Sequence, residues 1–190
     1  MEALKSNSHP IGWSIPSYAG GHCHITHVDR GSLEYLGSRK DCESLLDVGC
    51  GVGGQVQEAL SLGWGAFGID VDLDALGAPN VALIDLAHQP VIFHEKFDVV
   101  WSVETAEHIP EKFEDNYLMT LIKNCRRYLV MTASNIPMQL HVNCKPRDYW
   151  ISQLEKKGMW YDELGYRKLL EHSTMEREFL RNTGMFFVKE

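Results

Sequence analysis

The chain has 190 residues, of which 44% are hydrophobic and 23% are charged, close to the averages for a globular domain. A chain of this length and balance is neither a small disulfide-stapled scaffold nor a collagen-like or wholly disordered protein. Its net charge of −8 argues against nucleic acid as a partner, because proteins that bind nucleic acid usually neutralise phosphates with excess basic residues.

The sequence predicts neither a membrane protein nor a secreted one. No stretch reaches the about 18 consecutive apolar residues that span a bilayer, and residues 1–8 are too polar for a secretory signal. The five cysteines are odd in number and include no C-x-x-C pair, which argues against a disulfide framework and a cysteine-only zinc site. We therefore expect a cytoplasmic protein with free thiols, either a monomer or a homodimer.

Helical and strand patterns alternate along most of the chain. Residues 1–28 carry several prolines and glycines and are expected to form an irregular arm or lid. Asp29, with Ser32 as the alternative, is the predicted N-cap of a first helix that ends near Arg39. Further helices are predicted over 55–62 and beyond Pro110, and strands over 44–48, 66–71, 81–84, 97–102 and 127–132.

The C-terminal part continues this pattern. A helix is predicted from Asp148 to about Lys157, one charged helix over 166–181, and late strands over 159–161 and 185–188. Only residues 71–80 separate the second and third strands, too few for a full crossover helix. The alternation predicts a parallel sheet with helices on both faces, in a single α/β domain over residues 1–190. Its parts are an N-terminal arm (1–30), a cofactor-binding core (40–135) and a substrate-side loop (134–150).

A glycine-rich turn follows the first predicted strand and precedes a helix. Its glycines, among them Gly49, Gly51 and Gly53, let the backbone turn sharply and approach a ligand closely. The pattern G-x-G-x-x-G is also the dinucleotide fingerprint, so a nicotinamide cofactor is one alternative. Asp47 would repel a pyrophosphate and attract an amine-bearing ligand. Cys50 is interpreted as a small packed residue rather than a nucleophile.

Three motifs in this order resemble the class I S-adenosylmethionine-dependent methyltransferases of the small-molecule type. The glycine turn is similar to their motif I. Asp70 follows Gly51 by 19 residues, the spacing at which an acidic side chain meets ribose hydroxyls. The segment from Ser102 to His108 is similar to their strand-four motif, S-x-E-x-x-E-H.

The resemblance implies a Rossmann-like fold with a seven-stranded, mostly parallel sheet whose last strand is antiparallel. It implies S-adenosylmethionine as the cofactor and S-adenosylhomocysteine as its product. In this family Val71 would pack on the adenine and Asp85 would meet the adenine amino group, although the alternative for Asp85 is a solvated loop residue. The residues expected to contact the cofactor are Asp47, Gly49, Cys50, Gly51, Gly53, Asp70, Val71, Asp85 and Ser102.

Acceptor-side candidates follow the fourth and fifth strands, at the sheet edge where open α/β sheets bind ligands. Glu104 and His108 are candidate catalytic residues, and His141 is the first choice as a base or acceptor-orienting group because imidazole titrates near neutrality. The alternative is that His141 is a surface loop histidine, and that Glu107 and His108 merely begin the next helix.

A cluster of histidines in the arm raises the question of a metal ion. His22, Cys23, His24 and His27 lie within six residues. Because no second cluster of metal ligands is evident, we predict no metal site. The arm is instead expected to fold over the cofactor, with some of these histidines lining the substrate pocket.

Methyl transfer to a small-molecule acceptor is the predicted function. Once sheet and helices are assigned, only residues 1–30 and 134–150 remain to bind the acceptor, which leaves no added domain for a large partner. The alternatives are a protein or nucleic-acid acceptor within the same chemistry, a nicotinamide-dependent oxidoreductase, or a cofactor-binding module without catalysis.

Overall fold

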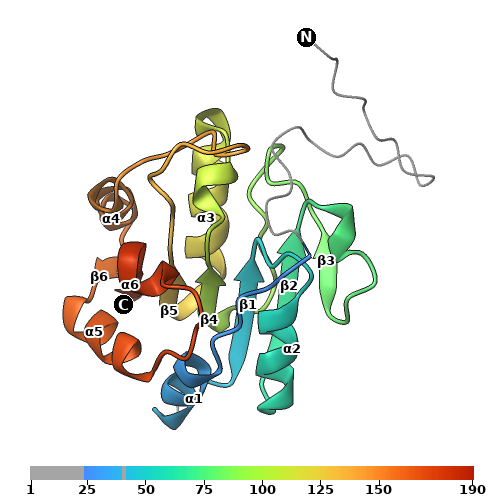
Figure 1. The fold of residues 1–190 in the computed structure, drawn as a ribbon, viewed down its shortest axis with the longest axis vertical. Coiled ribbons are helices and arrows are strands. Elements are labelled where there is room, and N and C mark those ends of the chain that lie inside the picture. The colour runs from blue at the N-terminus through green and yellow to red at the C-terminus, as the bar shows by residue number, and fades with distance from the viewer. Residues whose placement is uncertain (1–23, 40–41) are drawn as a thin grey trace.

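Seven strands form a single sheet in this computed structural model, which describes residues 24–39 and 42–190. They are β1 (Ser44–Val48), β2 (Gly65–Asp70), β3 (Val81–Leu83), β4 (Phe97–Ser102), β5 (Cys125–Met131), β6 (Trp160–Tyr161) and β7 (Met185–Val188). Their order across the sheet is β3-β2-β1-β4-β5-β7-β6 (Figure 1). Strands β1 to β5 are parallel, whereas β7 is antiparallel to β5 and β6. The predicted seven-stranded, mostly parallel sheet with an antiparallel last strand is confirmed.

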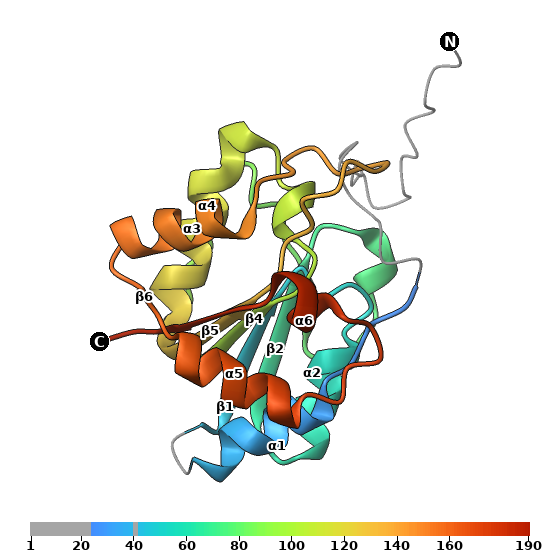
Figure 2. The same ribbon diagram turned by 60° about the vertical axis from the view of Figure 1, so that its left-hand side comes forward.

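Helices cover both faces of the sheet, as Figure 2 shows. One face carries α1 (Arg30–Ser38), α2 (Gly54–Ser61), α5 (Glu163–His172) and α6 (Phe179–Thr183), and the other carries α3 (Glu114–Asn124) and α4 (Arg147–Lys156). Short 3-10 helices lie at η1 (Leu73–Ala75), η2 (Ala106–His108) and η3 (Glu111–Phe113). The longest helix has 11 residues, and the described part of the chain contains none that could cross a membrane.

Strands β1, β2, β4, β5 and β7 each contribute to two hydrophobic cores, one beneath each layer of helices. In β4, Val100 packs in the core that contains Tyr117 of α3 and Trp150 of α4. Its neighbours Val99 and Trp101 point the other way, into the core of α1, α2 and α5. Because both faces are buried, the strands consist of nearly continuous apolar runs, which made them predictable from the sequence.

The order of the strands places the site. The chain moves from β1 outward to β2 and β3, then returns to add β4 on the other side of β1. The connections that follow β1 and β4 therefore diverge, and an open α/β sheet binds its ligands in the crevice between such connections. The turn after β1 and the segments after β2, β4 and β5 all lie at this edge.

The predicted elements agree with the structure except at one place. The strands are confirmed to within two residues, and the short connection over 71–80 holds only η1. The single helix predicted over 166–181 is wrong, because α5 ends at His172 and α6 begins at Phe179. Asp29 provides the physical reason: its buried carboxylate accepts hydrogen bonds from the Ser173 hydroxyl (2.5 Å) and the Thr174 N–H (2.9 Å), which hold this turn in place.

The same carboxylate begins the first helix. Asp29 is the N-cap of α1, as predicted, and accepts hydrogen bonds from the Ser32 N–H (3.0 Å) and the Ser32 hydroxyl (2.7 Å). Of the predicted N-terminal arm, residues 1–23 lie outside the described residues, and residues 24–29 form neither helix nor strand.

Candidate active site

The turn between β1 and α2 requires glycine at its first position. Gly49 has a φ of 79° and Gly51 a φ of 52°, in the left-handed region that side chains disfavour. A Cβ atom on Gly49 would lie 2.2 Å from the hydroxyl oxygen of Thr105. The N–H groups of Gly49 and Cys50 both donate to the carbonyl of Ile69, at 2.9 and 3.2 Å, which joins the turn to β2.

Asp70 ends β2 and faces this turn. Its carboxylate accepts hydrogen bonds from the backbone N–H groups of Gly51 (2.7 Å) and Asp72 (2.8 Å). These contacts fix the orientation of the half-buried carboxylate at the mouth of the turn. It is held where the ribose of a nucleoside would arrive if the nucleoside approached the glycines.

Burial raises the pKa of two further side chains in this region, Asp47 and Cys50. Burial, and next the neighbouring Asp70 carboxylate, raise the pKa of Asp47 to about 8. A cation placed beside Asp47 would therefore be strongly favoured, since it would stabilise the ionised form. Burial also raises the pKa of the Cys50 thiol, which argues against a nucleophilic thiolate there.

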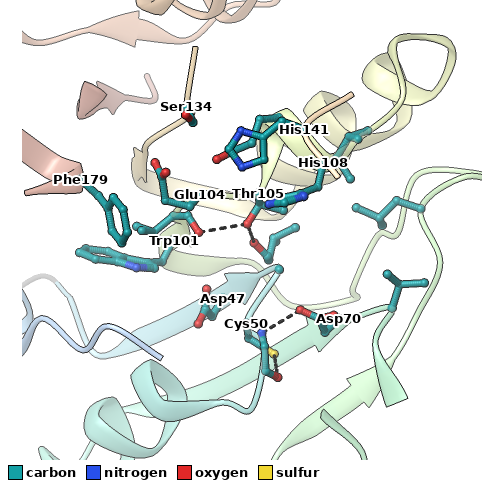
Figure 3. A pocket seen from close by; sticks show the side chains of 18 of the residues that line it. Asp47, Cys50, Asp70, Trp101, Glu104, Thr105, His108, Ser134, His141 and Phe179 are labelled. Carbon is teal, nitrogen blue, oxygen red and sulfur yellow. Dashed lines mark hydrogen bonds between the residues drawn. The ribbon is translucent and has the colours of Figure 1, made fainter. Parts of the chain in front are cut away.

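A cavity of about 720 Å³ opens above the turn and extends to the segments after β4 and β5. Asp47, Cys50 and Asp70 lie on one side of it, and Glu104, His108 and His141 lie opposite (Figure 3). Apolar side chains complete the lining, among them Val71, Ile84, Leu86, Trp101 and Phe179. The volume falls within the about 300–1,000 Å³ of sites that bind small molecules.

Glu104 is held rigidly on the far side of the cavity. Its N–H donates to the Thr132 hydroxyl (2.9 Å), and the same hydroxyl donates to the Glu104 carboxylate (2.7 Å). Its backbone has a φ of 52°, an unusual value for a residue other than glycine. Such strained backbone persists where surrounding contacts over-determine it, and it is common at functional sites.

The backbone of Glu107 brings two distant segments together. Its carbonyl oxygen accepts hydrogen bonds from the N–H groups of Val142 (2.8 Å) and Asn143 (2.9 Å). The loop after β5 is thereby tied to η2, and the rings of His108 and His141 meet edge to face with their centroids 4.9 Å apart. The structure thus brings these two segments together.

The Glu107 side chain is fully buried, and neither carboxylate oxygen has a hydrogen-bond partner among the described residues. Burial, and next the Glu104 carboxylate, raise the pKa of Glu107 to about 8. A buried, unpartnered carboxylate is costly, and in a native protein it calls for a functional explanation.

Comparison with known proteins identifies the core of the chain. The methyltransferase-domain family matches residues 46–131, which run from β1 to the end of β5 and contain the turn, Asp70 and Glu104. The core of the chain is therefore a methyltransferase domain. No curated protein matches the sequence of this methyltransferase.

Solved structures share the fold of this methyltransferase at low sequence identity. The magnesium protoporphyrin IX methyltransferase of Synechocystis, with bound S-adenosylmethionine, is 17% identical with a TM-score of 0.58, covering 83% of this chain and 76% of its own. A TehB-like methyltransferase of Corynebacterium glutamicum is 14% identical with a TM-score of 0.59, covering 84% and 88%. The plantazolicin methyltransferase BpumL, with bound S-adenosylhomocysteine, is 14% identical with a TM-score of 0.58, covering 84% and 81%.

Most of the predicted site residues of the methyltransferase line the cavity. They are Asp47, Gly49, Cys50, Gly51, Asp70, Val71, Asp85, Glu104, His108 and His141. Ser102 does not line it, because its buried hydroxyl donates to the carbonyl of Val48 (2.8 Å) and meets the Tyr117 hydroxyl (2.8 Å). Gly53 does not line it either, and serves as the left-handed N-cap of α2 with a φ of 78°.

The histidine cluster of the arm is only partly described. His27 lines the cavity and packs edge to face against Phe179, with ring centroids 5.3 Å apart. His24 is exposed and pairs with Asp74 at 3.3 Å. His22 and Cys23 lie outside the described residues.

The sequence did not predict several other residues that line the cavity of the methyltransferase, among them Thr105, Arg147 and Phe179. Thr105 packs against Gly49, and no local pattern announces this contact. Arg147 begins α4, where a basic residue is unremarkable. Phe179 and its neighbour Leu180 are apolar within the charged run 176–181, and this irregularity was the available signal.

Proposed function

We propose that this methyltransferase moves a methyl group from S-adenosylmethionine to a small-molecule acceptor. The observation that carries the proposal is the continuity of one cavity between the glycine turn and the residues after β4 and β5. Methyl transfer is an in-line displacement, so donor and acceptor must lie in one enclosed space with the reacting atoms about 3–3.5 Å apart.

The residues at the turn fit this cofactor. Gly51 and Gly49 leave the backbone unobstructed, and Asp70 presents a fixed carboxylate that can accept hydrogen bonds from ribose hydroxyls. Val71 and Asp85 also line this cavity, and Val71 offers an apolar surface to a base. Asp47 is buried and favours a cation, which suits the amino group at the methionine end of the cofactor.

The bound cofactor supplies a methyl group already activated on a sulfonium. What remains for the chain is to orient the acceptor, to exclude water, and to accept a proton where the acceptor must lose one. Glu104, His108 and His141 line the acceptor side of the cavity, and His141 is the residue that we assign to orienting or deprotonating the acceptor.

The volume of the cavity supports a small acceptor, and so does the small number of residues (1–30 and 134–150) that remain to bind it. The solved relatives named above include methyltransferases of magnesium protoporphyrin IX and of plantazolicin. The alternative of a nicotinamide cofactor is tested by the NAD titration below. A cytoplasmic location and a monomeric or homodimeric state remain predictions from the sequence.

Calorimetry followed by a labelling screen tests the proposal. The full chain is titrated with S-adenosylmethionine, S-adenosylhomocysteine and NAD, and we expect binding of the first two only. The chain is then incubated with methyl-labelled cofactor and separate pools of metabolites, protein and RNA. Label in the metabolite pool supports the proposal. Label only in protein or RNA, or tight binding of NAD alone, would overturn it.

A further inference from the structure

Three side chains on the acceptor side of the cavity have the arrangement of metal ligands. Glu107, His108 and His141 each offer one ligand atom, and these atoms all lie within 4.8 Å of one another. Figure 3 shows the two histidines side by side above the cavity. We propose that these three residues bind a divalent transition-metal ion.

The surroundings of the Glu107 carboxylate support a metal site. It is fully buried, and neither of its oxygens has a hydrogen-bond partner among the described residues. Burying an ionisable group is costly unless it is paired or ligates a metal. Glu104 adds a second carboxylate next to it, so the neighbourhood favours a cation.

The hydrogen bonds of the two histidines also support a metal site. The Nδ1 atom of His108 lies 3.1 Å from the carbonyl oxygen of Leu140, and that of His141 lies 2.8 Å from the carbonyl oxygen of Ile136. A carbonyl only accepts, so each Nδ1 carries the proton and each Nε2 is the unprotonated nitrogen of the neutral ring. A backbone carbonyl that accepts from the other ring nitrogen is the usual support of a metal-ligating histidine.

The spacing and the donor types indicate the class of metal. Two atoms that ligate one ion at about 2.0–2.2 Å are at most about 4.4 Å apart, so small side-chain movements suffice from the present arrangement. Two imidazoles with one carboxylate suit first-row transition ions such as zinc, iron or cobalt, whereas magnesium and calcium prefer oxygen ligands.

Three protein ligands leave coordination positions open to the cavity. The role of the ion rests on the proposed function: an oxygen of the acceptor would coordinate the ion and be held opposite the methyl donor. His141 would then orient the acceptor through the ion, since with its Nε2 on the ion it has no nitrogen left to accept a proton. No metal site was predicted, because no second cluster of metal ligands is evident in the sequence. The three ligands come from segments on either side of β5, so they are not neighbours along the chain. The hydrogen bonds of the Glu107 carbonyl to Val142 and Asn143 bring these segments together.

Cobalt binding to the full chain tests the site without recourse to activity. The chain is freed of metal with a chelator and titrated with Co²⁺, whose visible absorption reports its ligands, and with Zn²⁺ and Mg²⁺ by calorimetry. We expect about one Co²⁺ or Zn²⁺ per chain and much weaker binding of Mg²⁺. Glu107→Gln and His141→Ala should each weaken Co²⁺ binding about a hundredfold or more.

Two controls separate this site from other histidines. His94→Ala removes an imidazole that is 98% exposed and should leave Co²⁺ binding unchanged. The double variant His22→Ala/His24→Ala removes part of the N-terminal cluster and should also leave it unchanged. Binding that is lost in this double variant, or that survives in both Glu107→Gln and His141→Ala, would overturn the proposal.

Cofactor affinity, measured on the same samples, distinguishes the two hypotheses. Variants that retain binding of S-adenosylmethionine but lose Co²⁺ are folded and support the metal site. A wild-type chain that binds the cofactor and no transition ion overturns the metal site alone. A chain that binds Co²⁺ at these residues but no S-adenosylmethionine overturns the proposed function instead.

Discussion

The backbone N–H of Gly51 donates a 2.7 Å hydrogen bond to the carboxylate of Asp70. This contact joins the glycine turn after β1 to the end of β2, the two segments that carry the cofactor motifs. The Asp70 carboxylate therefore stabilises the fold as well as making the expected contact with ribose. In a variant, the first contribution is measured as stability and the second as cofactor affinity.

Replacement of Asp70 by alanine is expected to weaken binding of S-adenosylmethionine. A hydrogen bond to a charged group contributes about 1.5–3 kcal/mol, so affinity should fall roughly ten- to a hundredfold. Calorimetry measures the affinity, and thermal unfolding reports the lost contacts with the turn. Asp74→Ala, at an exposed position on η1, is the matched control and should leave affinity unchanged. Equal affinity of wild type and Asp70→Ala would place the ribose contact elsewhere.

Gly49→Ala should destabilise the fold more than Gly63→Ala. Both glycines have a left-handed φ, of 79° and 83°, so each substitution incurs a backbone cost of about 1–2 kcal/mol. At Gly63 nothing lies within 4 Å of the added Cβ, whereas at Gly49 the Thr105 hydroxyl lies 2.2 Å away. Urea unfolding measures the stability of both variants. If they are equally stable, the contact between Gly49 and Thr105 does not restrict position 49 to glycine.

Binding of the cofactor at pH 7 should release a proton from Asp47. Because its pKa is raised to about 8, Asp47 is mostly protonated in the free protein, and a cationic ligand favours the ionised form. Calorimetry in buffers of different ionisation enthalpy should show release of up to about one proton. Asp47→Asn should bind more weakly and without this release. Equal release in both proteins would identify another group as the source.

Asp47 also sets a pH dependence of folding. Its pKa in the folded protein lies above the about 3.9 of an unfolded chain, so its protonated form is the one that folding favours. Its contribution to stability is therefore complete below about pH 4 and is lost as the pH rises through 8. In the absence of ligand, Asp47→Asn should gain stability relative to wild type over this window, as followed by urea unfolding.

Asp98 should behave in the opposite sense. Burial alone would raise its pKa, but hydrogen bonds from the Glu43 N–H (3.1 Å), the Ser44 hydroxyl (2.8 Å) and Arg126 (2.8 Å) hold it below the usual value. The stability that Asp98 contributes is present above about pH 4 and is lost as the pH falls through the lowered pKa.

Asp98→Asn should consequently cost about 1.5–3 kcal/mol at pH 7. The difference from wild type should shrink as the pH falls below about 4, where the wild-type carboxyl also becomes protonated. Glu155→Gln, at an exposed position on α4, is the control. A deficit of the same size at every pH would show that shape rather than charge matters at Asp98.

The cofactor half of the site was predictable from the sequence, and the acceptor half was predictable only in part. Gly49, Gly51 and Asp70 lie directly after apolar strands, so local spacing alone assigns them to the binding edge of the sheet. His141 reaches His108 only because a loop returns to the Glu107 carbonyl, a contact that no local pattern encodes. Phe179 was missed because the break after α5 depends on Asp29, far away in the sequence.

Asp29 therefore controls the cavity from outside it. One buried carboxylate holds the start of α1 and the turn after α5, and the chain then leads directly into α6 and Phe179. The position of Phe179 in the cavity therefore depends on the N-cap of α1, which lies on the face of the sheet opposite α3 and α4. A change at Asp29 would thus move Phe179 and alter which acceptors fit, although no residue that lines the cavity is itself substituted.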